Sequence, residues 1–141
     1  MAFPHKVVAI TGASTGLGAE MARQLTRQGC KVALMARNGD KLAALAAELG
    51  PNALALPCNV DDFAQVQAAV ARTEAELGPI DCMIANAGIG QKLAPGPWDP
   101  TVPEQILRTN VQGMVHALYA VLPAMQERGR GHLVGMASMA S

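Results

Sequence analysis

The chain of 141 residues is long enough for one domain with one core, and we assign residues 1–141 to a single domain. Half of the residues are hydrophobic and 16% are charged, which excludes a disordered chain. Basic and acidic residues balance at 11 each, without a basic run, and aromatic residues make up 3%, so neither nucleic-acid nor membrane binding is expected. The longest apolar stretch, residues 114–125, is too short to span a bilayer.

Short apolar runs alternate along the chain with segments of helical periodicity. Five runs are expected to form strands: residues 7–10, 31–36, 53–57, 81–86 and 132–136. The first of them is continuously apolar, as in a strand that is covered on both faces. Helical spacing of large apolar residues predicts four helices, over residues 16–28, around 42–49 and 66–77, and over 103–127. This alternation predicts βαβ units and a doubly wound, parallel α/β sheet.

The apolar stripes predict which helix faces pack against this sheet. In the first helix the stripe is Leu17, Met21 and Leu25. In the long helix it consists of eight large residues: Ile106, Leu107, Val111, Met114, Val115, Leu118, Leu122 and Met125. The adjacent carboxylates of Asp61 and Asp62 are explained by capping of the third helix, for which either residue is suitable.

A glycine-rich turn follows the first apolar run, at residues 11–18. Gly12 permits a tight turn, Gly16 allows close approach of a ligand, and Gly18 allows the helix to pack closely on the strand. In a parallel sheet, ligands bind beyond the carboxyl ends of the strands, and the N-terminus of a helix attracts phosphate groups. We therefore expect a nucleotide pyrophosphate here, with an ordinary glycine-containing loop as the alternative; the spacing does not fit a Walker A loop.

Four motifs in chain order resemble those of the classical short-chain dehydrogenase/reductase family. The glycine spacing Gly-x3-Gly-x-Gly of residues 12–18 is similar to that family's cofactor loop. Asn86-Ala87-Gly88 resembles its Asn-Ala-Gly motif, residues 110–113 resemble its Asn-Val-x-Gly motif, and Ser138 resembles its catalytic serine. The resemblance implies a Rossmann fold with strand order 3-2-1-4-5, whose last strands would lie beyond residue 141.

The family's residue roles carry over to the matching positions. Residues 86–88 would stabilise the sheet and line the cofactor groove, where the alternative is a plain turn that ends a strand. Asn110 would bend the long helix and hold a water of the proton relay, where the alternative is a local bond to the helix backbone. Ser138 would bind the substrate carbonyl oxygen, where the alternative is an ordinary serine at a strand end. Asn59 stands where the family often has an aspartate that contacts the adenine, with Val60 beside it.

The end of the second apolar run bears on the choice between NADP and NAD. An acidic residue at this place would bind the ribose 2′-hydroxyl of NAD, but the chain has Ala36 there. Arg37 follows and can bind a 2′-phosphate through two hydrogen bonds, with Ser14 and Asn38 as further donors. We therefore expect NADP rather than NAD. The complete set of expected cofactor-binding residues is Gly12, Ser14, Thr15, Gly16, Leu17, Gly18, Arg37, Asn38, Asn59, Val60, Asn86, Ala87 and Gly88.

The resemblance implies an oxidoreductase that transfers hydride between the nicotinamide and a carbonyl or alcohol substrate, with Ser138 and Asn110 as catalytic residues. The family's Tyr-x-x-x-Lys motif is absent, because the single tyrosine, Tyr119, is followed four residues later by Pro123. We therefore expect the 141-residue chain to be catalytically incomplete. The alternative is a nucleotide-binding module or pseudoenzyme without turnover. An extended-type sugar epimerase or dehydratase is disfavoured by the glycine spacing and by Asn-Ala-Gly.

Three further expectations concern metals, location and assembly. The histidines His5, His116 and His132 are scattered along the chain, so no metal site is expected. The odd number of widely spaced cysteines (three) predicts reduced, buried thiols in a cytoplasmic protein. The resemblance implies a homodimer or homotetramer for the full-length protein, assembled through the long helix.

Overall fold

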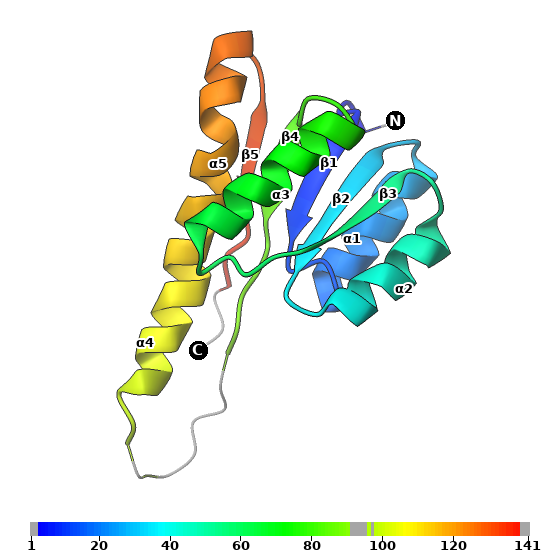
Figure 1. Ribbon diagram of the computed structural model, residues 1–141. Helices are drawn as coiled ribbons and strands as arrows, with labels where there is room; N and C mark the ends of the chain where they lie inside the picture. The colour runs from blue at the N-terminus through cyan, green and yellow to red at the C-terminus, as the bar shows by residue number, and fades with distance from the viewer. Residues whose placement is uncertain (1–2, 91–95, 97, 139–141) are drawn as a thin grey trace.

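The computed structural model describes residues 3–90, 96 and 98–138, and its centre is a parallel sheet (Figure 1). The strands are β1 (Val7–Thr11), β2 (Lys31–Ala36), β3 (Ala53–Pro57), β4 (Cys82–Ala85) and β5 (His132–Gly135). Their order is β3-β2-β1-β4-β5, and every neighbouring pair is parallel. The predicted α/β class and the strand order 3-2-1-4-5 are thus confirmed.

Helices cover both faces of the sheet. They are α1 (Gly16–Arg27), α2 (Gly39–Leu49), α3 (Phe63–Glu76), α4 (Thr101–Leu107), the π-helical segment η1 (Arg108–Gln112) and α5 (Gly113–Arg128). Alternate residues of β1 serve two cores, because side chains of a strand point to opposite faces. Val8 and Ile10 pack with α1 and α2, whereas Val7 and Ala9 pack with α3 and α5. The prediction that β1 is covered on both faces is therefore confirmed.

The face of α5 that packs on the protein differs from the predicted apolar stripe. Its buried residues are Gly113, Ala117, Val121 and Met125, of which only Met125 belongs to that stripe. From the predicted stripe, Leu107 is 61% exposed, Val111 57% and Val115 46%. Small residues face inward because α5 approaches its neighbours closely. A Cβ atom at Gly113 would lie 2.6 Å from Cγ2 of Val60.

The stripe predicted for α1 is wrong at one position for the same reason. Leu17 is 68% exposed, while Gly18, Ala19, Ala22 and Leu25 form the buried face. A search for large apolar side chains misses a face that is built from glycine and alanine.

The predicted long helix is one helical run over residues 101–128 that contains a π-helical turn. The turn, η1, includes Asn110. Such turns interrupt the regular hydrogen-bond ladder and are frequent at functional sites. A loop is expected over residues 88–100. Its described residues 88–90, 96 and 98–99 form no helix or strand, and residues 91–95 and 97 lie outside the described part.

The two adjacent carboxylates before α3 have different roles. Asp62 is the N-cap, and its side chain accepts hydrogen bonds from the backbone N–H groups of Ala64 and Gln65. Asp61 instead accepts from Gln105 Nε2 at 2.7 Å and from Thr109 Oγ1 at 2.9 Å. Capping therefore accounts for Asp62 only, and Asp61 joins the beginning of α3 to the helical run of α4 and η1.

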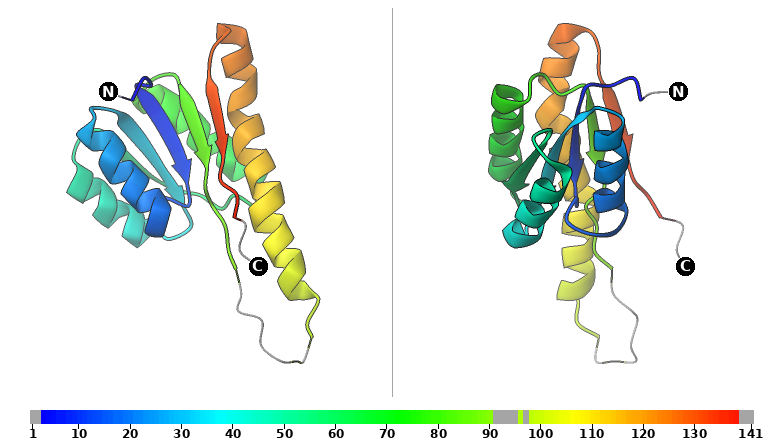
Figure 2. Two further views of the ribbon diagram at one scale, coloured as in Figure 1. Left: turned by 180° about the vertical axis from the view of Figure 1, so that it is seen from behind. Right: turned by 90° about the vertical axis from the view of Figure 1, so that its right-hand side faces the viewer.

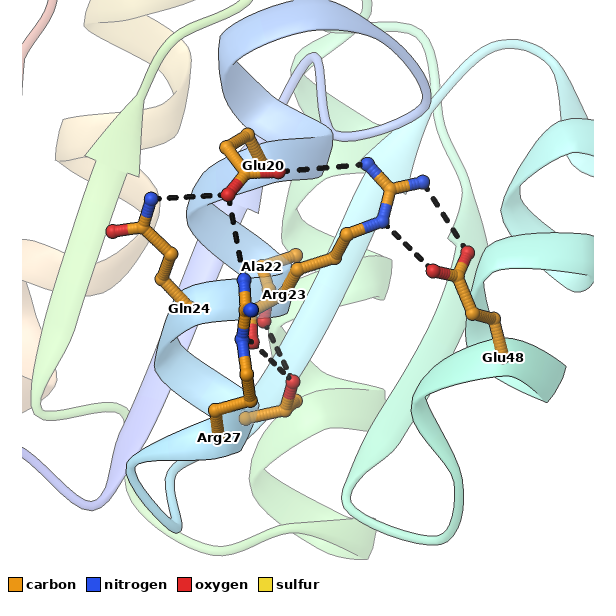
Figure 3. Close-up of polar contacts among 7 residues, drawn as sticks. Glu20, Ala22, Arg23, Gln24, Arg27 and Glu48 are labelled. Carbon is orange, nitrogen blue, oxygen red and sulfur yellow. Dashed lines mark hydrogen bonds and ion pairs between the residues drawn. The ribbon is translucent and has the colours of Figure 1, made fainter.

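On the other face, a surface ion pair joins α1 to α2 (Figure 3). The guanidinium of Arg23 donates from Nε to Glu48 Oε1 at 2.8 Å and from Nη2 to Oε2 at 3.2 Å. The hydrogen bond from Arg23 holds the pKa of the Glu48 carboxyl below its ordinary value. Both side chains are substantially exposed, so the pair orients the helices and adds little stability.

A buried hydroxyl connects the carboxyl ends of the two central strands. Thr11, the last residue of β1, is 1% exposed, and its Oγ1 accepts hydrogen bonds from the N–H groups of Asn86 and Ala87, each at 3.0 Å. Asn86 returns the contact, because its Nδ2 donates to the carbonyl oxygen of Gly12 at 3.3 Å. We call this set the strand-end joint; it holds the glycine-rich loop against the segment that follows β4.

We predict that Thr11→Val destabilises the chain. Valine has a similar shape but no hydroxyl, so two largely buried N–H groups lose their acceptor, and the free energy of unfolding should fall by about 1–3 kcal/mol. Equilibrium urea unfolding measures this change. Thr11→Ser keeps the hydroxyl and should retain more of the stability than the valine variant. Equal stability of the valine variant and the original chain would contradict a structural role for the joint.

Candidate functional site

A cavity of about 300 Å³ lies beyond the carboxyl ends of β1, β2 and β4. Its lining comes from five places in the chain: Gly12, Ser14, Thr15, Ala36, Arg37, Asn38, Cys58, Asn59, Val60, Asn86, Ala87, Gly88, Ile89 and Thr109. The direction in which successive strands are added to the sheet reverses here, because β2 lies on one side of β1 and β4 lies on the other. This is the place where ligands bind in doubly wound sheets.

Most of the expected cofactor residues meet at this cavity. Among the described residues that line it, only Gly16, Leu17 and Gly18 of the expected set are missing. Gly16 has a positive φ of 56°, which favours glycine, and a Cβ atom there would meet nothing within 4 Å. The backbone at Gly16 is therefore open to an approaching group.

Two glycines make the close packing of this loop possible. Gly12 has a φ of 65°, and a Cβ atom there would lie 2.7 Å from Cα of Ala87. A Cβ atom at Gly18 would lie 2.8 Å from Nδ2 of Asn86 and would collide with the carbonyl oxygen of Gly12. Gly18 thus allows α1 to pack closely on Asn86 and on the glycine loop that directly follows β1.

The end of β2 carries a positive charge at the cavity. Ala36 ends the strand, and Arg37 and Asn38 follow it on the cavity wall. The Asn38 side chain accepts a hydrogen bond from Lys41 N at 3.1 Å and so caps α2. Arg37 is exposed and forms no ion pair with any described residue, which leaves its guanidinium available to an anion.

The segment after β3 forms the opposite wall. Oδ1 of Asn59 accepts from Asp61 N at 3.0 Å, and its own backbone N–H donates to Gln65 Oε1 at 2.9 Å. The side-chain NH2 group of Asn59 is therefore the part that can serve a ligand. Burial, followed by the charge of Asp62, raises the pKa of the Cys58 thiol to about 11, so Cys58 is a protonated wall residue and no nucleophile.

The side chain of Asn110 contacts the loop after β4, and its expected role in the proton relay stays a prediction. Its Oδ1 accepts from Ile89 N at 2.7 Å, and its Nδ2 donates to Ile89 O at 2.8 Å. These bonds clamp η1 to the loop after β4, which is a tertiary contact and no local bond within the helix. Asn110 is not part of the described cavity lining, although its neighbour Thr109 is.

Ser138 lies three residues beyond the end of β5 and is exposed. Pairing continues past that strand, because Met136 N donates to Ala85 O at 3.0 Å. This directs the chain toward the same carboxyl edge of the sheet as Asn86. The described lining of the cavity does not include Ser138, and its catalytic role stays a prediction.

Three residues of this region were not predicted from the sequence: Thr11, Thr109 and Ile89. A threonine at the end of an otherwise apolar buried strand is a usable signal, because a buried hydroxyl needs a partner. Thr109 and Ile89 carry no such signal, since they reach the cavity only through the packing of η1 and the loop after β4.

The sequence suggested that the three histidines are scattered, but two of them lie together in the structure. At the amino ends of the strands, His5 Nε2 lies 3.0 Å from His132 Nδ1, and one ligand atom each of His5, His132 and Cys82 lie within 4.8 Å of one another. His116 is elsewhere, with Nδ1 against the carbonyl oxygen of Val60. Parallel pairing of β1, β4 and β5 brings together ends that are far apart in sequence.

Among the helices of the described residues, none has the length and the apolar character that a membrane span requires.

Comparison with known proteins places these features in a family. The NADP-dependent 3-hydroxy acid dehydrogenase YdfG of Salmonella typhimurium is 34% identical over 140 residues, which cover 95% of this chain and 54% of that protein. An uncharacterized oxidoreductase of Staphylococcus haemolyticus is 34% identical over 137 residues, which cover 96% of this chain and 59% of that protein. The chain thus spans little more than half the length of these curated relatives.

A solved structure and a family model agree with these relatives. The 3-ketoacyl-(acyl-carrier-protein) reductase from Brucella melitensis, crystallised with NADH, superposes with a TM-score of 0.84 at 33% identity, covering 88% of this chain and 52% of that chain. The family model for short chain dehydrogenases matches residues 6–141. Because the match covers nearly the whole sequence and the fold has the same strand order that the motifs implied, this chain belongs to the short-chain dehydrogenase family.

Proposed function

We propose that the chain binds NADP in the cavity at the carboxyl edge of the sheet, as part of an enzyme that transfers hydride between the nicotinamide and a carbonyl or alcohol substrate. The observation that carries the proposal is the cavity itself, which gathers the glycine loop, Arg37 and residues 86–88 around one space. The nicotinamide supplies the hydride chemistry, and the protein supplies binding and orientation.

The beginning of α1 suits a pyrophosphate. Its N-cap, Thr15, forms no hydrogen bond from its side chain to the first turn, and the first intrahelical bond runs from Ala19 N to Thr15 O. The N–H groups of the first turn are thus available, and they carry the positive end of the helix dipole. The close packing of Gly12 and Gly18 keeps side chains out of this approach.

Charge at the end of β2 supports NADP over NAD. Ala36 offers no carboxylate to bind a 2′-hydroxyl or to repel a 2′-phosphate, and the Arg37 guanidinium has no ionic partner within residues 3–90, 96 and 98–138. Ser14, on the same cavity wall, adds a hydroxyl. The similar proteins include both an NADP-dependent dehydrogenase and a reductase crystallised with NADH, so the comparison of the two cofactors is the test of this preference.

We predict that Arg37→Asp lowers NADP affinity about ten- to a hundredfold, because charge-assisted bonds worth about 1.5–3 kcal/mol are lost. NAD affinity should stay equal or rise. Calorimetric titration of both cofactors measures the change. Arg72→Asp, on the surface of α3, makes the same change of charge away from the cavity and should leave both affinities unaltered. Equal binding of NADP and NAD by the original protein would contradict the proposed preference.

Proton delivery is the step that residues 1–141 do not supply. Reduction of a carbonyl needs an acid at the oxygen while hydride reaches the carbon. Tyr119 lies on α5 with 62% of its surface exposed, and the residue four positions later is Pro123. We propose that Ser138 orients the carbonyl by a hydrogen bond, and that the acid is a tyrosine whose pKa a neighbouring lysine lowers, as in the family.

We therefore predict that a polypeptide of residues 1–141 oxidises no NADPH above background with a panel of ketones and aldehydes. A second polypeptide, extended at the C-terminus through a Tyr-x-x-x-Lys segment, should turn over at least one of them. Turnover by the shorter polypeptide would refute this assignment of the acid. An extended polypeptide that folds and binds NADP without turnover would favour a nucleotide-binding module instead.

We also propose that the protein is a homodimer or homotetramer assembled through the outer face of the long helical run. Leu107, Val111, Val115 and Tyr119 are exposed along this face. Four large side chains at helical spacing form a patch of the kind that marks protein interfaces.

The three cysteines are buried and unpaired, which supports the reducing environment of the cytoplasm as the location.

We predict that Val115→Asp shifts the protein toward the monomer, because a buried unpaired carboxylate opposes association. Sedimentation velocity measures the distribution of species. Ala68→Asp introduces the same charge at an exposed position of α3 and should leave the assembly intact. A monomeric original protein, or the same response to both substitutions, would rule out this interface.

A further inference from the structure

The amino edge of the sheet, opposite the cofactor cavity, holds a cluster of potential metal ligands. Strands β1, β4 and β5 run side by side with the N-terminus of the chain near their amino ends (Figure 2). His5 precedes β1 by two residues, and Cys82 and His132 are the first residues of β4 and β5. The register pairs Cys82 with His132, and Val8 of β1 with Cys82. Parallel pairing therefore places these three side chains at one edge.

We propose that His5, Cys82 and His132 bind a zinc ion. Two imidazoles and one thiolate are a donor set that suits zinc, with water in the fourth position. Zinc–ligand distances of about 2.0–2.3 Å imply ligand atoms roughly 3.3–3.6 Å apart in a tetrahedral site. In this structure the two histidine nitrogens are 3.0 Å apart, and all three ligand atoms lie within 4.8 Å, so shifts of about 1 Å would close the site.

The surroundings hold the segment that carries His5 in place. A second cavity, of about 390 Å³, opens at this edge and is lined by Pro4, His5, Lys6, Asp81, Arg130 and Gly131. Asp81 fixes the segment that carries His5, because its Oδ2 accepts from Lys6 N at 3.0 Å and from Val7 N at 2.9 Å. Cys30 donates to the carbonyl oxygen of His5 at 3.2 Å. These contacts hold the backbone around His5 in place.

Zinc binding at this site involves no redox step. The Cys82 S–H bond breaks and its proton passes to water, while the sulfur forms a bond to zinc. The hydrogen bond between the two histidines is lost, and each ring donates a nitrogen lone pair to the ion. The thiol loses its proton when the sulfur binds the metal, because the thiolate is the form that acts as a ligand.

The site would have a structural consequence that is independent of the dinucleotide. His132 belongs to β5, the edge strand of the sheet, and is exposed. A zinc ion would link this edge strand to β4 and to the segment before β1. Since an ion that binds the folded chain stabilises it, zinc should raise the melting temperature.

The test is titration of the metal-free protein with Co²⁺ and then Zn²⁺, followed by absorption spectroscopy and by thermal unfolding. We expect one ion per chain, a thiolate-to-cobalt charge-transfer band in the near ultraviolet that zinc abolishes, and a higher melting temperature. His132→Ala should weaken binding at least about tenfold, which is roughly 1.4 kcal/mol. Its side chain is exposed, so this variant should still fold.

Controls separate this site from other causes. His116→Ala removes the histidine that lies outside the cluster and should bind Co²⁺ as the original protein does. Cys82→Ser should abolish the charge-transfer band, and if this core variant fails to fold, His5→Ala replaces it. Absence of the band, or equal binding by the His132 and His116 variants, would overturn the proposal. NADP should bind with the same affinity with and without zinc, so failure here leaves the proposed function untouched.

Discussion

The arrangement of the carboxyl edge depends on the hydroxyl of Thr11. One buried oxygen accepts two backbone N–H groups from the segment after β4, and Asn86 donates back to Gly12. Two loops that are more than 70 residues apart in sequence are thereby held in contact. Their separation sets the width of the cavity between them. Because a Cβ atom at Gly12 or Gly18 would overlap this contact, the glycines and the threonine form one unit.

A second clamp extends this unit to the long helical run. The Asn110 amide forms two hydrogen bonds with the backbone of Ile89, and the π-helical turn presents it toward that loop. Asp61 performs a similar function from the segment after β3, since it binds Gln105 and Thr109. Loops after three strands are thus fixed to one another by side chains that satisfy backbone or hydroxyl groups. Such a cavity needs little reorganisation when a ligand enters.

The two edges of the sheet differ in chemistry because parallel strands separate them. The carboxyl edge collects glycines, amides and the guanidinium of Arg37, which are groups suited to phosphate and ribose. The amino edge collects two imidazoles and a thiol, which are suited to a soft cation.

Local pattern by itself determined the strands, the glycine loop and, through four short motifs, the family, because apolar runs and glycine positions are properties of neighbouring residues. Which side of the long helical run faces inward was decided only by tertiary packing. Gly113 and Ala117 face inward because the helix lies close to its neighbours, so the larger Val111 and Val115 remain outside. The same holds for Asn110, whose partner Ile89 is 21 residues away, and for His5 and His132, which are 127 residues apart. The contact of His5 with His132 arises from the parallel pairing of β1, β4 and β5, and that of Asn110 with Ile89 from the packing of η1 on the loop after β4. Both depend on tertiary packing, which no local pattern records.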